Sequence, residues 1–183
     1  MFTIMVRRTA YLLGSILFLL ALPAGAETAC LSLDAVPALV CSARTIVLGE
    51  LHGTTQGPAF AAALACALSR AGTPVLLGVE VLASEQAAID NYLSGGSERG
   101  FYSAAQASSF WVREKHDGRA STAMLALLRR IRDLRAHGAK VEVVTFDPVP
   151  SQYRPGDTRD RLMAENLRAA RAAQNPEAVK AAA

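Results

Sequence analysis

The stretch TIVLGELHG at residues 45–53 decides the fold class. Its first four residues are apolar or β-branched without interruption, which is typical of a strand buried on both faces, and Gly49 ends the run. Two similar runs follow at residues 75–79 and 141–146. Helical patterns separate or follow these strands at residues 58–71, 84–93, 121–136 and 157–170. The alternation predicts an α/β fold with three layers, in which helices cover a mainly parallel sheet.

Residues 94–119 show no clear period and are predicted to form a long connection, a kind of segment that is often functional in compact domains. Ser84 and Ser121 are predicted to cap the helices that follow them. His137 and Gly138 are typical of the end of a helix.

The amino-terminal residues have the pattern of a secretory signal peptide. Arg7 and Arg8 precede an apolar run at residues 10–22, and Ala24-Gly25-Ala26 has the form of a cleavage site. The run of about 13 residues is short of the roughly 20 that cross a membrane. We therefore expect cleavage near Ala26, a periplasmic or secreted protein, and no stable membrane span after cleavage.

The predicted mature chain has a balanced charge. Residues 1–26 hold two of the 19 basic residues and none of the 16 acidic ones, so the net charge falls from +3 to 17 − 16 = +1. This balance gives no reason to expect a nucleic-acid partner. We divide the mature chain into an N-terminal segment, residues 27–42, and one α/β domain, residues 43–183.

Three strands make a thin sheet, and residue 183 comes where another strand would be expected. We therefore expect the carboxyl-terminal part of the domain to be incomplete. An uncovered sheet edge of this kind would favour self-association.

Three cysteines are present in the chain. Cys30 and Cys41 bracket a ten-residue segment, and a disulfide between them suits an oxidising compartment. Cys66 lies in an apolar helical pattern and is interpreted as a small buried core residue. The spacing of the three is not that of a metal site.

Polar residues stand where the predicted strands end. Glu50 and His52 follow the first strand, Glu80 ends the second and Asp147 ends the third. Ligands of open parallel sheets bind beyond the carboxyl ends of the strands, so these four residues define a candidate site, which we call the rim. Carboxylates grouped with an imidazole can hold a divalent cation or perform acid-base catalysis.

Not every rim residue needs a functional explanation. Asp147 precedes Pro148 and also fits a turn or a helix cap. His116 is a further candidate ligand residue beside Asp117, in a charged segment that follows Trp111. The alternative for that segment is a surface loop with an aromatic lid.

Taken together, the ordered motifs resemble a known family. They are VLGELHG at 47–53, GVE at 78–80, FW at 110–111 with DGR at 117–119, and FD at 146–147 with RDRLMA at 159–164. The set, spanning about residues 43–172, resembles the ChaN-like haem-binding uptake proteins. These belong to a superfamily with the Tiki/TraB proteases and the erythromycin esterase-like hydrolases.

The resemblance implies an α/β domain with a rim site formed by Glu50, His52 and Glu80. For the ChaN-like branch it implies haem or iron acquisition at the envelope, with haem or another small molecule as ligand. The resemblance also implies that a tyrosine can ligate the haem. Tyr92, Tyr102 and Tyr153 are the candidates, and the sequence does not choose among them. The other branches imply a hydrolase of esterase or protease type, in which His52 is a general base and the two glutamates orient water or hold a divalent metal. Whether the chain is an enzyme stays open at this point.

Overall fold

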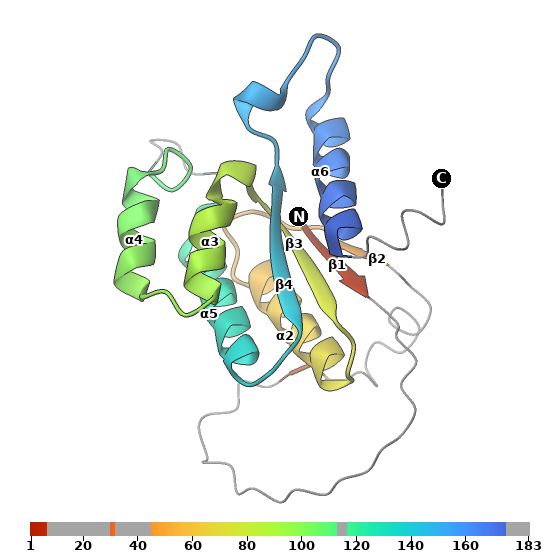
Figure 1. The fold of residues 1–183 in the computed structure, drawn as a ribbon, viewed down its shortest axis with the longest axis vertical. Helices are drawn as coiled ribbons and strands as arrows, with labels where there is room; N and C mark the ends of the chain where they lie inside the picture. The colour runs from red at the N-terminus through yellow and green to blue at the C-terminus, as the bar shows by residue number, and fades with distance from the viewer. Residues whose placement is uncertain (7–29, 32–44, 113–116, 175–183) are drawn as a thin grey trace, which may run out of the picture.

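The computed structural model describes residues 1–6, 30–31, 45–112 and 117–174 (Figure 1). In this part of the chain four strands form one mixed sheet, and five α-helices accompany it. The α/β class expected from the sequence is confirmed.

The sheet has the strand order β2-β1-β3-β4. The three expected strands are present as β2 (Thr45–Leu48), β3 (Val75–Leu82) and β4 (Val141–Asp147). The fourth strand, β1 (Phe2–Val6), lies between β2 and β3 and is antiparallel to both, whereas β3 and β4 are parallel. The expectation of a mainly parallel sheet is therefore wrong for two of the three strand pairs.

Strand β1 lies in the part of the chain that we predicted to be the start of a signal peptide. Its apolar side chains Phe2 and Ile4 are 0% exposed, because they point from alternate positions into the core. Residues 7–29, which include the rest of the predicted signal peptide, lie outside the described residues. Cleavage near Ala26 stays a prediction.

Strands β2, β3 and β4 all run in the same direction, because β1 is antiparallel to both of its neighbours. Their carboxyl ends therefore meet at one edge of the sheet, as the sequence indicated. The amino end of β1 lies at the same edge, which brings the start of the chain to the rim.

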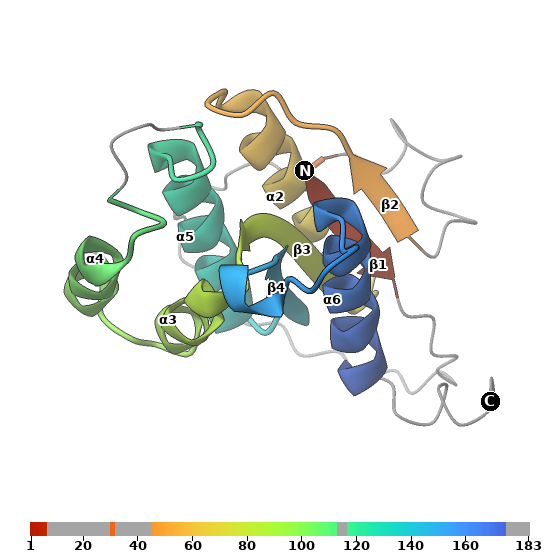
Figure 2. The same ribbon diagram turned by 90° about the horizontal axis from the view of Figure 1, so that it is seen from above.

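Helices lie on both faces of the sheet (Figure 2). On one face α2 (Gln56–Arg70) and α5 (Thr122–Ala136) pack together over the main core, with α3 (Gln86–Leu93) beside α5. On the other face α6 (Arg159–Gln174) packs against β4. Helix α6 comes so close to the sheet that a Cβ on Gly78 would be 2.9 Å from a methyl carbon of Leu167.

The segment expected to be a long connection contains a helix, α4 (Glu98–Ala107). The Ser97 hydroxyl caps it by accepting a hydrogen bond from the Gly100 amide at 3.0 Å, and Phe101 and Ala105 form its buried face. The helix expected from Ser84 instead begins at Gln86, after a 3₁₀ turn. The cap at Ser121 is confirmed, because its hydroxyl accepts from the Met124 amide at 3.2 Å.

The disulfide joins Cys30 to Cys66, so the predicted pairing of Cys30 with Cys41 is wrong. The Cα atoms of Cys30 and Cys66 are 5.4 Å apart, and the neighbouring Leu31 amide donates a hydrogen bond to the Ala63 carbonyl of α2. Residues 30–31 therefore lie along α2, which brings Cys30 to Cys66. Cys41 lies outside the described residues.

Within the described residues, no helix combines the length and the apolar character needed to cross a membrane.

Candidate functional site

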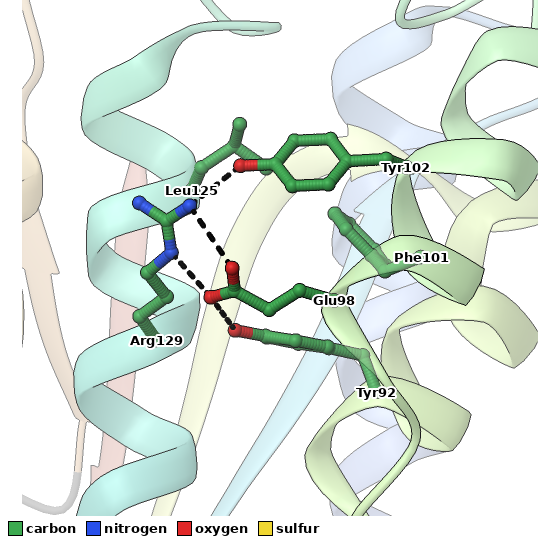
Figure 3. Close-up of a pocket in the computed structure, with 6 residues that line it drawn as sticks. All are labelled: Tyr92, Glu98, Phe101, Tyr102, Leu125 and Arg129. Carbon is green, nitrogen blue, oxygen red and sulfur yellow. Dashed lines mark hydrogen bonds and ion pairs between the residues drawn. The ribbon is translucent and has the colours of Figure 1, made fainter.

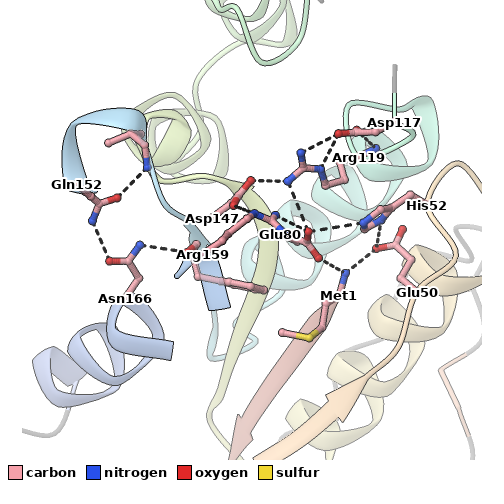
Figure 4. Close-up of polar contacts among 12 residues, drawn as sticks. Met1, Glu50, His52, Glu80, Asp117, Arg119, Asp147, Gln152, Arg159 and Asn166 are labelled. Carbon is pink, nitrogen blue, oxygen red and sulfur yellow. Dashed lines mark hydrogen bonds and ion pairs between the residues drawn. The ribbon is translucent and has the colours of Figure 1, made fainter. Parts of the chain in front are cut away.

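The carboxyl ends of β2 and β3 bring three of the predicted residues together (Figure 4). Glu50 and His52 follow β2 and Glu80 lies near the end of β3. A tight turn positions His52: the Thr54 amide and hydroxyl both donate to the Leu51 carbonyl, at 3.3 and 2.8 Å, and Gly53 adopts a positive φ of 84°.

The imidazole of His52 lies between two carboxylates. Its Nδ1 is 3.4 Å from Glu50 Oε2, and its Nε2 is 3.6 Å from Glu80 Oε1. The His52 side chain is 28% exposed, whereas those of Glu50 and Glu80 are 3% and 10% exposed. Nδ1 itself is buried and makes no hydrogen bond within the described part of the chain. The ring as a whole is thus reachable from solvent, although its Nδ1 faces Glu50.

A cation is already held between the two glutamates. The α-ammonium nitrogen of Met1 is 3.2 Å from Glu50 Oε2 and 3.0 Å from Glu80 Oε2. It reaches them because β1 begins at the edge where β2 and β3 end. The carboxylate pair can therefore accommodate a positive charge directly beside His52.

Two arginines complete the rim, and sequence reasoning did not assign them to the site. Arg159, at the start of α6, donates from Nη2 to Glu80 Oε1 at 2.6 Å and from Nε to Asp147 Oδ1 at 2.7 Å. Arg119 contacts Asp147 Oδ2, and its Nη1 is 3.5 Å from Glu80 Oε1. Both arginines lie in motifs that carry the family resemblance, which was the available signal.

Asp147 is engaged by these arginines rather than by His52. The carboxylate is 3% exposed and accepts hydrogen bonds from both guanidinium groups. A buried carboxylate requires such partners, so Asp147 orients the arginines at the rim. Asp117 contributes to the rim indirectly, because its carboxylate accepts a hydrogen bond from Arg119 Nη2 at 2.7 Å.

These contacts shift the pKa values of the rim groups. Burial alone would raise the pKa of Glu80, but hydrogen bonds from Arg159 and the Met1 ammonium outweigh it, and the pKa lies below its usual value. The hydrogen bond to Asp147 is the main reason why the pKa of Arg159 is raised. Glu80 is therefore ionised at neutral pH, and both arginines are charged.

The prediction that His116 is a ligand residue falls outside the described residues. Trp111 is described and does not contribute to the rim. Trp111 packs against Phe101 and Phe110, and its indole nitrogen donates to Glu85 Oε2 at 2.9 Å. Trp111 is thus a packing residue.

A separate pocket lies between α3, α4 and α5 (Figure 3). It is lined by Tyr92, Glu98, Phe101, Tyr102, Leu125 and Arg129. Two of the candidate tyrosines are therefore here, where the Tyr92 hydroxyl donates to Glu98 at 3.3 Å. The third, Tyr153, is 42% exposed beyond β4.

No group of three or more His, Cys, Asp or Glu side chains in the described residues is arranged to hold a metal ion. Two glutamates and one histidine do share the rim, with the Met1 ammonium between the glutamates.

No family model, curated protein or solved structure matches this chain.

Proposed function

We propose that this chain is an exported protein that binds haem or another iron-containing ligand at the rim, through Glu50, His52 and Glu80. The observation that carries the proposal is the partly exposed His52 ring held between the two carboxylates at the carboxyl ends of β2 and β3. The sequence motifs that resemble ChaN-like uptake proteins support the same ligand class.

The chemistry of the rim residues fits an iron-containing ligand. Imidazole nitrogens bind iron readily, and carboxylates are common partners of iron in proteins. The His52 side chain is 28% exposed between the two carboxylates, so a ligand can reach the ring from solvent. Glu50, His52 and Glu80 would hold the ligand, and haem would supply an iron that protein side chains can ligate.

Arg159 could pair with the carboxylates of haem, because the two groups have opposite charge. Haem carries two propionate groups, and the Arg159 side chain, which contacts Glu80, is 41% exposed. Arginine matches carboxylates well because its donors are planar and paired. We assign Arg159 the role of pairing with a propionate, while Arg119, which is 14% exposed, holds Asp147.

A haemin titration of the full chain, followed at the Soret band, tests the proposal. We expect saturable binding at one haem per chain and an affinity at least about tenfold lower for His52→Ala, equivalent to about 1.4 kcal/mol. The matched control is His137→Ala, because His137 is exposed and its Nδ1 lies 2.7 Å from the Asp133 carbonyl at the end of α5. Equal affinities for the two variants, or no saturable binding by the folded chain, would contradict the proposal.

The ammonium held between Glu50 and Glu80 favours a second candidate, a hydrolase. In this alternative His52 is the general base that takes a proton from water, and the two glutamates orient the water or would hold a divalent cation. Ester and peptide hydrolysis should then disappear in His52→Ala and persist in His137→Ala. Haemin binding without hydrolysis supports the first candidate, and hydrolysis without haemin binding supports the second.

A further inference from the structure

Strand β1 fills a slot between two strands that run in the same direction. Phe2 is opposite Leu48 of β2 and Val79 of β3, and the pairing continues to Met5 on the β2 side and Val6 on the β3 side. In the described part of the sheet, β2 is joined to β3 only through β1. Without these residues, both neighbours would present unpaired backbone groups toward one another.

The slot recognises side chains as well as backbone. Phe2 and Ile4 are completely buried in the core that the sheet forms with α2 and α5. Thr3 points to the opposite face, where it is 3% exposed and its hydroxyl makes no hydrogen bond within the described residues. A buried hydroxyl without a partner is unfavourable, so the position of Thr3 is better suited to an apolar side chain of the same shape.

The slot also recognises the amino end of the strand. The Met1 ammonium contacts Glu50 and Glu80 at 3.2 and 3.0 Å, at the point where the slot opens on the rim. Proteins recognise peptides by adding them to a sheet as an extra strand, and also by binding their amino terminus. Here the two occur together on one six-residue segment.

We propose that the space between β2 and β3 is a binding slot for an extended peptide with a free α-amino group, which residues 1–6 occupy as an intramolecular ligand. The peptide runs antiparallel to both strands and places apolar side chains at its second and fourth positions. Its amino group lies between Glu50 and Glu80. If residues 1–26 are removed, as the sequence predicts, the slot opens to a peptide of this kind. The inference rests on strand pairing rather than on the proposed haem binding, although both ligands would use Glu50 and Glu80.

Peptide exchange in the full chain tests the slot. A site for a sequence-specific protease is introduced between residues 20 and 21, so that cleavage releases the covalent link to β1. A synthetic peptide of residues 1–8, labelled with a fluorophore at its carboxyl end, is then added, and binding is followed by fluorescence anisotropy. We expect saturable binding to the cleaved chain and none to the uncleaved chain.

Two altered peptides test the recognition of the ends and side chains. Acetylation of the amino group should weaken binding at least tenfold, because it removes the charge that faces Glu50 and Glu80. A Thr3→Val peptide should bind at least fivefold more tightly, because it buries no unpaired hydroxyl.

The cleaved chain could unfold when β1 is lost, so circular dichroism is used to measure whether it stays folded. Refolding that depends on the added free-amine peptide supports the slot. Failure of the peptide to bind or to restore the fold, or equal binding of the acetylated and free peptides, would overturn the proposal.

Discussion

Gly118 and Gly53 meet backbone to backbone: a Cβ on Gly118 would lie 2.5 Å from the Cα of Gly53. Both residues have a positive φ, of 87° and 84°. The contact joins the turn that carries His52 to the segment that carries Arg119. The two sides of the rim are therefore positioned by a contact that only glycine permits at residue 118.

Gly118→Ala should separate the two segments. The methyl group cannot fit against the Gly53 backbone, so we expect a loss of stability larger than the roughly 1–2 kcal/mol of a positive φ alone. Chemical denaturation measures the effect. The control is Gly72→Ala, because Gly72 has a φ of 77° but a Cβ at this position would have no atom within 4 Å. Equal losses in the two variants would show that the contact does not position the rim.

The ionisation of Glu80 should make stability depend on acidic pH. Its pKa is lower in the folded protein than in the unfolded chain, whose ordinary value is 4.5. The stabilisation is therefore complete above about pH 4.5 and is lost as the pH falls toward the folded pKa, with a slope of up to about 1.4 kcal/mol per pH unit. Denaturation curves between pH 6 and pH 3 should show a shallower dependence for Glu80→Gln.

Glu98→Gln is the matched control for Glu80→Gln. A hydrogen bond from Arg129 lowers the pKa of Glu98, but this carboxylate is exposed and its ion pair is screened by solvent. We expect Glu98→Gln to change the pH dependence of the free energy of unfolding less than Glu80→Gln does. An equal change in both variants would show that burial of Glu80 does not strengthen its contribution.

The disulfide should be found between Cys30 and Cys66 when the oxidised protein is digested and its peptides are identified by mass spectrometry. It closes a long loop, so reduction should lower the free energy of unfolding by about 3 kcal/mol. Cys41→Ser should preserve both the link and the stability. A peptide in which Cys30 is joined to Cys41 would contradict the structure.

Glu85 should stabilise the region around α4. Its carboxylate accepts hydrogen bonds from the Ser108 hydroxyl at 2.7 Å and from the Trp111 indole at 2.9 Å. Glu85→Ala leaves both donors without this acceptor, so we expect a loss of about 2–3 kcal/mol and a red shift in the fluorescence of the single tryptophan. Glu165→Ala removes only an exposed ion pair with Arg161 and should have little effect on either measurement.

The strands that carry the rim were predictable because each is a short, continuous apolar run with polar residues at its carboxyl end. That pattern was enough to expect Glu50, His52 and Glu80 at one edge. Strand β1 was not predicted, because its mostly apolar residues precede Arg7 and Arg8 and so also match the start of a signal peptide. Local sequence does not show that these residues pair with β2 and β3, because the pairing depends on residues far away in the chain.

Other differences also have physical reasons. Helix α4 was missed because Gly95, Gly96 and Gly100 obscure the helical period, although Ser97 followed by Phe101 and Ala105 was a usable signal. The roles of Arg119 and Arg159 depend on contacts with residues far away in the sequence. Spacing among the cysteines likewise carries no information on how the chain runs along α2.

The central claim, that a haem-type ligand binds beside His52, is tested most directly by nuclear magnetic resonance of the full chain labelled with ¹⁵N-histidine. The probe is gallium protoporphyrin, a diamagnetic analogue of haemin. We expect the ring nitrogens of His52 to shift as the ligand saturates, while those of His137 stay unchanged. Saturable binding with no change at His52 would place the ligand elsewhere and contradict the account.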